Sequence, residues 1–171
     1  MITKNRFIVA SLIVAVGMFF IGLNNGFAEG KKKFNKKNLP PAVLSAFEKT
    51  YPKAKINGGG KEEENGKTYY EIESVDGKVK RDLLYDADGN VFETEEGIAV
   101  KDLPEMVAKT LKEQYSKSKI LKSEKVTHAT DVEYEFLLSG AKGKSEIVID
   151  SKGAVVRTEK NGEGKEKDDD D

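Results

Sequence analysis

The sequence predicts an α+β fold made of two tandem repeats, each one helix packed on a four-stranded antiparallel β-meander. The first observation is a constant offset of 64 residues: segment 38–43, Asn-Leu-Pro-Pro-Ala-Val, matches 102–107, Asp-Leu-Pro-Glu-Met-Val, and Tyr51 matches Tyr115. The second is a change of hydrophobic period inside each copy, from helical spacing to alternation. An offset held across both copies indicates a duplicated supersecondary unit.

Each repeat is expected to begin with a helix. Asn38 or Asp102 can serve as the N-cap, and Pro40 and Pro104 stand early, where a proline costs no hydrogen bond. Apolar side chains then recur at helical spacing and predict one buried stripe per helix: Leu39, Val43, Ala46 and Phe47, and Leu103, Val107, Thr110 and Leu111.

After each helix, turn signals divide the chain into short strands. In the first copy these are Asn65-Gly66, Asp76-Gly77 and the segment 86–90, Asp-Ala-Asp-Gly-Asn. The expected strands lie near 54–63, 67–75, 78–86 and 90–95, and near 119–128, 131–139, 144–150 and 154–159. Whether the two sheets join edge to edge is left open by the sequence.

Alternation along the strands predicts a sheet with one face against the helix and the other open to water. Tyr70 and Ile72 alternate with Glu71 and Glu73, and Leu83 and Tyr85 have the parity of the core. The open face is therefore the expected partner-binding surface, and its carboxylates are expected to stay solvated and ionised. The candidate partner-binding residues are Tyr69, Glu71, Glu73, Leu84, Glu133, Glu135 and Val148.

The ends of the chain are expected to lie outside the fold. Lys4 and Arg6 precede an apolar run over 7–23, and Gly26-Phe27-Ala28 offers a cleavage site, which is typical of a signal peptide. An uncleaved N-terminal anchor is the competing interpretation. The expected organisation is a signal peptide at 1–28, a basic disordered segment at 29–37, repeats at 38–101 and 102–160, and an acidic disordered tail at 161–171. The expected location is periplasmic or secreted, with membrane contact only through the uncleaved signal.

Composition excludes several classes of protein. The chain has no cysteine, which rules out disulfides, thiol catalysis and cysteine-ligated metals. Removal of Lys4 and Arg6 with the signal leaves 27 basic and 30 acidic residues, a net charge of −3. A nucleic-acid-binding protein would show a basic excess, so no nucleic-acid partner is expected.

No catalytic, cofactor-binding or metal-binding residue is predicted. The segment 86–90 resembles the start of an EF-hand, but its glycine is fourth and position twelve is Gly97, so a hairpin turn is the better interpretation. His128 is the only histidine and is expected in an exposed loop. Gly58-Gly59-Gly60 lacks the Lys-Ser or Lys-Thr of a phosphate loop and is interpreted as a bulge or bend.

The repeated pattern resembles a known family. The Leu-Pro-x-x-Val helix ending in tyrosine, the strands with Tyr-Glu-Ile and Tyr-Glu-Phe, and the Asp-x-x-Gly hairpins resemble the PepSY-like, β-lactamase-inhibitor-like proteins of bacterial periplasms. The resemblance covers about 38–95 and 102–159. It implies an exported, non-enzymatic module with a helix against a four-stranded antiparallel sheet, and in the β-lactamase inhibitor itself two such units build a concave eight-stranded surface that grips an enzyme. The chain differs from the β-lactamase inhibitor in having no tryptophan and no disulfides.

Two functional hypotheses follow. The first is a non-catalytic binding module that engages a protein partner in the cell envelope through its open sheet face or its exposed edges, with inhibition of an envelope enzyme as one form of this function. The second is a cation- or small-ligand-binding envelope protein that uses the acidic face and the run Asp168–Asp171. An enzyme is a distant third.

Overall fold

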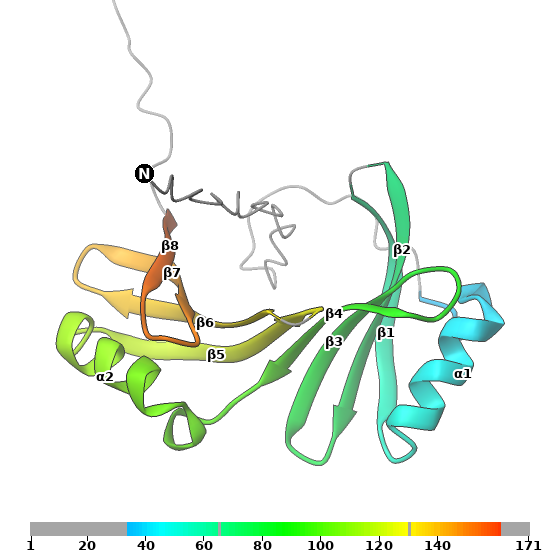
Figure 1. Cartoon of the computed structure of the whole chain (residues 1–171), viewed down its shortest axis with the longest axis horizontal. Coiled ribbons are helices and arrows are strands. Elements are labelled where there is room, and N and C mark those ends of the chain that lie inside the picture. Colours follow the sequence, from blue (N-terminus) through cyan, green and yellow to red (C-terminus); the bar gives the residue numbers. More distant parts are fainter. Residues whose placement is uncertain (1–33, 65, 130, 162–171) are drawn as a thin grey trace, which may run out of the picture. The chain divides into compact units, whose positions relative to one another are not determined.

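A computed structural model describes residues 34–64, 66–129 and 131–161 of the chain. The chain divides into Met1–Lys32 and Lys33–Asp171, and all described residues belong to the second unit. Its elements, in order, are η1 (Lys36–Asn38), α1 (Pro41–Thr50), β1 (Lys55–Glu64), β2 (Lys67–Asp76), β3 (Val79–Tyr85), β4 (Val91–Gly97), η2 (Val100–Asp102), α2 (Glu105–Gln114), β5 (Lys119–His128), β6 (Asp131–Gly140), β7 (Gly143–Asp150) and β8 (Val155–Asn161) (Figure 1).

The repeat predicted from the sequence is present in the structure. Every element of the second copy begins 64 residues after its counterpart, from η1 and η2 through to β4 and β8. The register also shifts at equivalent places, between Ile56 and Gly58 in β1 and between Ile120 and Lys122 in β5. The duplication therefore extends to backbone irregularities that the residue types alone do not specify.

All eight strands belong to one antiparallel sheet, in the order β1-β2-β3-β4-β5-β6-β7-β8. The two meanders are joined because β4 pairs with β5, placing Glu93 opposite His128 and Gly97 opposite Glu124. The expectation of a separate four-stranded meander for each helix is thus corrected to a single sheet carrying both helices. Pairing at this junction removes one exposed edge from each meander, which is favourable for a sheet in water.

The expected side-chain N-caps are not formed. Both helices begin after Pro40 and Pro104, and neither has a side-chain cap, whereas Asn38 and Asp102 end the short 3₁₀ helices η1 and η2. The cause is the Leu-Pro step. A residue before proline is kept out of the helical region, and Leu39 is extended with ψ 142°. The polar side chain is therefore too far back along the chain to reach the first helical turn.

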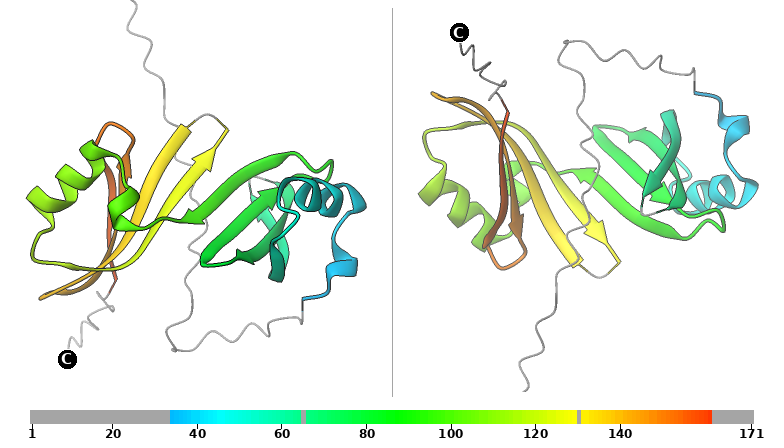
Figure 2. Two further views of the ribbon diagram at one scale, coloured as in Figure 1. Left: turned by 90° about the horizontal axis from the view of Figure 1, so that it is seen from below. Right: turned by 90° about the horizontal axis from the view of Figure 1, so that it is seen from above.

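Both helices pack on the same side of the sheet, each over its own repeat (Figures 1 and 2). The core under α1 consists of Leu39, Val43, Phe47, Ile72, Leu83 and Tyr85. The core under α2 consists of Val107, Leu111, Tyr134, Phe136, Leu138, Ile147 and Ile149. These sets confirm the buried stripes and strand parity predicted from the sequence.

The connection between the repeats packs on the second repeat through Ile98, whereas Val100 in the same connection stays 47% exposed. Ile98 lies against the core of the second repeat, and its N–H donates to the Ser123 carbonyl at 3.1 Å. The Ser123 hydroxyl donates back to the Ile98 carbonyl at 2.6 Å. Phe34, 64 residues earlier, packs in the same way on the core of the first repeat. Each helix is thus anchored by an apolar residue that precedes it.

The turn over 86–90 is a hairpin turn, as predicted. Gly89 has φ +84° and the equivalent Gly153 has φ +87°. A Cβ atom at Gly89 would lie 2.7 Å from the Ala42 carbonyl oxygen, and one at Gly153 would lie 2.8 Å from that of Met106. Glycine is therefore required at each of these positions for two reasons: the positive φ angle, and the close approach of the turn to the helix backbone.

Some sequence predictions fall outside the described residues. These are the signal peptide or anchor at 1–28, most of the basic segment at 29–37, and the acidic tail apart from Asn161. Lys36 and Lys37, assigned to the basic disordered segment, lie instead in η1, and the Lys36 ammonium contacts the Glu48 carboxylate at 2.6 Å. Among the described helices, none has the length and apolar character needed to cross a membrane.

Candidate functional site

The candidate site is the side of the sheet opposite the helices, which we call the open face. Cross-strand pairs place side chains on it: Glu71 lies opposite Leu84, and Glu135 lies opposite Val148. Since strand residues two apart share a face, Tyr69 and Glu73 join the first pair and Glu133 joins the second. All seven predicted partner-binding residues therefore lie on one face of one sheet, in two groups separated by β4 and β5.

The seven residues are not equally accessible. Glu73, Leu84, Glu133 and Glu135 are partly exposed, whereas Tyr69 and Glu71 are buried. Val148 is only 1% exposed, so its side chain supports the face and is not available for direct contact with a partner. The alternation of residues along a strand identifies the face on which a side chain lies. It does not show whether that side chain is exposed to solvent or buried beneath its neighbours.

The centre of the open face is formed by residues that the sequence analysis did not select. The β4–β5 pairing places Glu93 opposite His128 and Glu95 opposite Val126. The alternation of Glu93 and Glu95 along the sequence could have placed both residues on the open face. Their position at the centre of that face, however, results from the pairing of the two meanders. The site is therefore continuous across both repeats.

Three carboxylates from adjacent strands form a cluster that we call the carboxylate triad: Asp82 of β3, Glu95 of β4 and Glu124 of β5. One oxygen from each lies within 4.8 Å of the others. Asp82 and Glu95 are direct cross-strand partners, and Glu124 reaches the pair from the next strand. The Lys122 ammonium contacts Glu124 at 2.6 Å and supplies positive charge at one side.

The triad shifts the protonation of its members. Burial, with repulsion from Glu124 and Glu135, raises the pKa of Glu95 to about 8. Burial and repulsion from Glu124 also raise the pKa of Asp82. Burial opposes the charge of Lys122, but the hydrogen bond and charge of Glu124 outweigh it, so the pKa of Lys122 is raised. Near neutral pH the triad therefore holds a proton that an incoming cation would displace.

A second group of charges lies over the second repeat. Arg157 of β8 places its guanidinium 3.2 Å from Glu135 and 3.6 Å from Glu146. Burial nevertheless raises the pKa of Glu135 to about 7, against the lowering effect of Arg157. The expectation that the open-face carboxylates remain solvated and ionised is thus wrong for Glu135, because neighbouring side chains exclude water from it.

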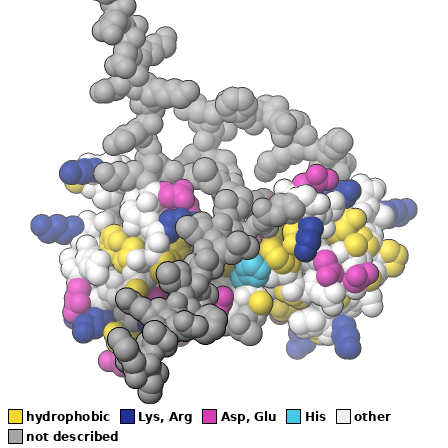
Figure 3. All heavy atoms as spheres, turned by 45° about the horizontal axis from the view of Figure 1, so that its top comes forward, with side chains coloured by type: hydrophobic (Ala, Val, Ile, Leu, Met, Phe, Trp, Pro, Cys, Tyr) yellow, Lys and Arg dark blue, Asp and Glu magenta, His cyan; other side chains and the backbone are white. Residues whose placement is uncertain are grey.

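An aromatic stack lies on the same face as the triad, around the next cross-strand pair of that face, Glu93 and His128. The Phe92 ring centroid lies 4.2 Å from that of Tyr69 and 4.3 Å from that of His128. The register shift opposite β4, between Leu84 and Tyr85, turns Phe92 toward the open face. His128, expected in an exposed loop, is instead the last residue of β5 and is held in this stack. Figure 3 shows the histidine beside hydrophobic side chains, with acidic groups nearby.

The arrangement combines features that favour cationic groups. Clustered carboxylates attract ammonium and guanidinium groups, and an adjacent aromatic surface allows an arginine side chain to stack. The three triad oxygens also have the chemistry and spacing to contact a single divalent cation. Both possibilities use the same central strands, β3, β4 and β5.

The fold and the open face define a class of protein: a tandem α+β module with two helices on one side of an eight-stranded antiparallel sheet. The family model described as "Putative beta-lactamase-inhibitor-like, PepSY-like" matches residues 28–93 and, a second time, 68–157. The chain belongs to this family, which confirms the resemblance found in the sequence.

Solved structures show the same fold. A putative periplasmic protein from Bacteroides eggerthii aligns with a TM-score of 0.60 at 17% identity, covering 71% of this chain and 88% of that chain. A DUF2874 family protein from Bacteroides uniformis gives 0.59 at 17% identity, with coverages of 70% and 88%. A BLIP-like protein from Bacteroides fragilis gives 0.56 at 19% identity, with coverages of 73% and 89%. No curated protein matches the chain at a significant level.

Proposed function

We propose that the protein is an exported, non-catalytic binding module whose open face engages a protein partner in the cell envelope and inhibits it where that partner is an enzyme. The family description supports the inhibitor-like role, and the periplasmic description of the Bacteroides eggerthii protein supports the location. The signal-like N-terminus of the sequence agrees with export.

The observation that carries this proposal is the construction of the open face. The described helices both pack on the other side, so the duplicated sheet presents one surface to which both repeats contribute. At its centre an aromatic stack lies beside partly buried charge. Protein interfaces concentrate binding energy in such central aromatic groups, while surrounding polar residues exclude water and set specificity.

The charge of the open face defines the partner's chemistry. Glu73, Glu133 and Glu135 are partly exposed carboxylates, and Asp82 of the triad is partly exposed as well, whereas Glu95, with its pKa of about 8, adds little charge at neutral pH. A complementary partner presents lysine or arginine side chains to this surface, which accelerates encounter and rejects acidic proteins. We therefore expect association to weaken as the salt concentration rises.

The test uses the purified protein as bait in an envelope extract from its own organism, followed by binding measurements with the retained partner. Charge reversal at the partly exposed Glu73, Glu133 and Glu135 is expected to weaken that partner's binding by tenfold or more, since a like-charge contact costs about 1.4 kcal/mol or more. If the partner is an enzyme, its turnover is measured with and without the protein.

The matched control reverses three carboxylates on the helix side: Asp102, Glu105 and Glu113 are exposed and make the same change in net charge. The control is expected to bind like the parent protein. An equal loss of affinity in both variants would show that only the net charge of the protein matters. Unchanged affinity in the open-face variant would show that the interface lies on another surface.

A second candidate function is cation binding, favoured by the convergence of Asp82, Glu95 and Glu124 within 4.8 Å. Calorimetry with calcium before and after Glu95→Gln tests the triad, and removal of Asp168–Asp171 tests the acidic tail separately. Absence of heat in the parent protein would dismiss this function. Because Lys122 already neutralises part of the triad, protein binding remains the better-supported proposal.

A further inference from the structure

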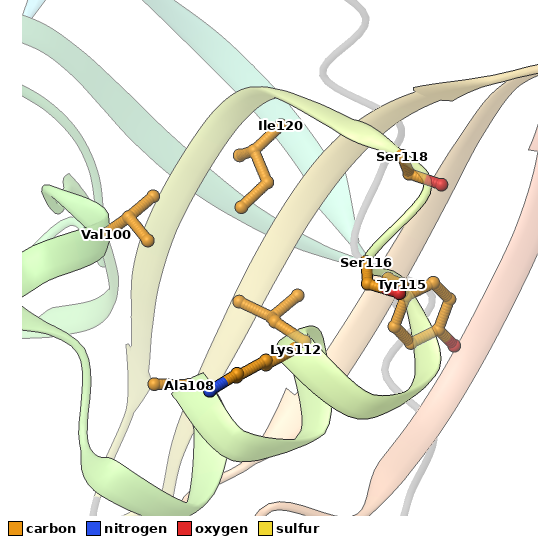
Figure 4. A pocket seen from close by; sticks show the side chains of 8 residues that line it. Val100, Ala108, Lys112, Tyr115, Ser116, Ser118 and Ile120 are labelled. Carbon is orange, nitrogen blue, oxygen red and sulfur yellow. The ribbon is translucent and has the colours of Figure 1, made fainter.

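A groove lies on the helix side of the second repeat, away from the open face. It runs between η2, α2 and the start of β5 and has a volume of about 230 Å³. Figure 4 shows Val100 and Ile120 across from the helix residues Ala108 and Lys112. The groove is smaller than the roughly 300–1,000 Å³ pockets that hold drug-sized ligands, so it suits a short chain or a single ring.

The repeat supplies an internal comparison for this groove. Ala108 and Leu111 line it, and the residues 64 positions earlier are the larger Leu44 and Phe47. Phe47 is 1% exposed and fills the core beneath α1. The second repeat thus has less side-chain volume than the first at the same two places on the same helix. The two copies therefore differ in the side-chain volume that they place at this part of the helix.

The rims of the two copies also differ. In the first repeat, Lys36 of η1 and Glu48 of α1 form an ion pair at 2.6 Å that joins the 3₁₀ helix to the helix beside it. The equivalent residues in the second repeat are Val100 and Lys112, which both line the groove. Val100 is 47% exposed, and Lys112 forms no ion pair with any described residue. An ion pair in the first copy is thus replaced by an apolar side chain and a cation in the second.

This combination has a definite chemical preference. The walls formed by Val100, Leu111 and Ile120 favour an aliphatic or aromatic body, and the Lys112 ammonium favours a negative head group. Ser116 and Ser118 add hydroxyl groups at the other end of the groove. A neutral hydrocarbon would leave Lys112 without a partner, and a cation would be repelled by it.

We propose that this groove binds a small amphiphilic anion, such as a medium-chain carboxylate, with its apolar body between α2 and β5 and its head group at Lys112. The site is independent of the open face, since it lies on the opposite side of the sheet and uses residues of the second repeat only. A ligand here would contact both α2 and the connection that leads into it from β4.

Octanoate is a suitable probe, because about ten non-hydrogen atoms imply a dissociation constant on the order of 1 mM. Amide chemical shifts of the purified, isotope-labelled protein are followed during titration with octanoate and, separately, with the neutral analogue 1-octanol. The expected result is saturable change confined to residues 100–120, with octanoate bound two- to five-fold more tightly than octanol. This ratio is the effect of about 0.4–1 kcal/mol from one exposed ion pair.

Three variants decide the question. Lys112→Gln is expected to remove the preference for octanoate over octanol, whereas Lys109→Gln, on the same helix and 4.0 Å from Glu113, is expected to keep it. Ala108→Leu combined with Leu111→Phe introduces the side chains of the first repeat and is expected to abolish binding. The dispersion of the amide spectrum shows whether this double variant is folded, and the two lysine variants keep the test valid if it is not.

Several results would overturn the proposal. Absence of saturable shifts in residues 100–120 of the parent protein would show that the groove is not a ligand site. Equal affinity for octanoate and octanol would reject an anion site, as would identical behaviour of the two lysine variants. Retained binding in the folded double variant would place the ligand elsewhere. None of these results depends on whether the open face binds a protein.

Discussion

Replacement of Glu95 by glutamine tests the electrostatics of the carboxylate triad directly. Burial and neighbouring carboxylates raise the pKa of Glu95 from its usual 4.5 to about 8. A carboxyl with a raised pKa in the folded state contributes stability at low pH, and this contribution is lost as the pH rises through about 8. The parent protein is therefore expected to lose stability between pH 5 and pH 9 through this group.

The magnitude follows from the two pKa values. Since one pKa unit corresponds to about 1.4 kcal/mol, the loss between pH 5 and pH 9 has a ceiling of about 4 kcal/mol. Relaxation of Asp82 and Glu124 around the new charge lowers the actual value, and we expect roughly 2–3 kcal/mol. Glutamine has the shape of the protonated acid and cannot ionise, so the Glu95→Gln variant avoids this loss.

The assay is urea unfolding of both proteins at pH 5, 7 and 9, with the exposed helix variant Glu113→Gln as control. The stability advantage of Glu95→Gln over the parent is expected to grow with pH, while the control stays parallel to the parent. A stability difference between Glu95→Gln and the parent that stays constant from pH 5 to pH 9 would refute the raised pKa and the buried character of the triad.

Three further predictions concern other parts of the molecule. Gly89→Ala is expected to destabilise the protein by about 2 kcal/mol or more in urea unfolding, because the added Cβ would meet the adjoining helix. Gly77 has φ +60° but open space around it, so Gly77→Ala is expected to cost only about 1 kcal/mol. Arg157→Gln removes the charge that lowers the pKa of Glu135, so an NMR titration is expected to place that pKa above about 7; a lower value would contradict the ion pair. Phe136→Ala empties a fully buried core position and is expected to cost about 3–5 kcal/mol, and a loss below 1 kcal/mol would mean that the second core is loosely packed.

Much of the fold could be predicted because its determinants are local. Turn residues such as Gly89 and the alternation around Ile72 placed every strand within a few residues, and the repeated Leu-Pro-x-x-Val segment located both helices. The wrong N-caps show the limit of this reasoning. Asn38 has the right residue type, but the geometry before Pro40 moves the helix start beyond its reach.

The centre of the candidate site could not be predicted, because it depends on which strands pair. Glu95 and Glu124 are distant in sequence and come together only through the β4–β5 junction, which the composition of either strand leaves undetermined. Phe92 joins the open face because of a bulge, although simple alternation would assign it to the helix side. The raised pKa values also arise from burial, which a residue pattern does not measure.

The duplication has a consequence at the two edges of the sheet. In the described chain, β1 and β8 each pair with one neighbour, and they are the counterparts of β5 and β4, which already pair with each other. The described strand β8 of one molecule is therefore preorganised to meet β1 of the next in a head-to-tail contact. Such a contact is heterologous, so repeated addition of copies gives either a closed ring or an open filament. In the register of the existing junction, Glu159 would face Glu62, and repulsion between these two carboxylates opposes the growth of a filament.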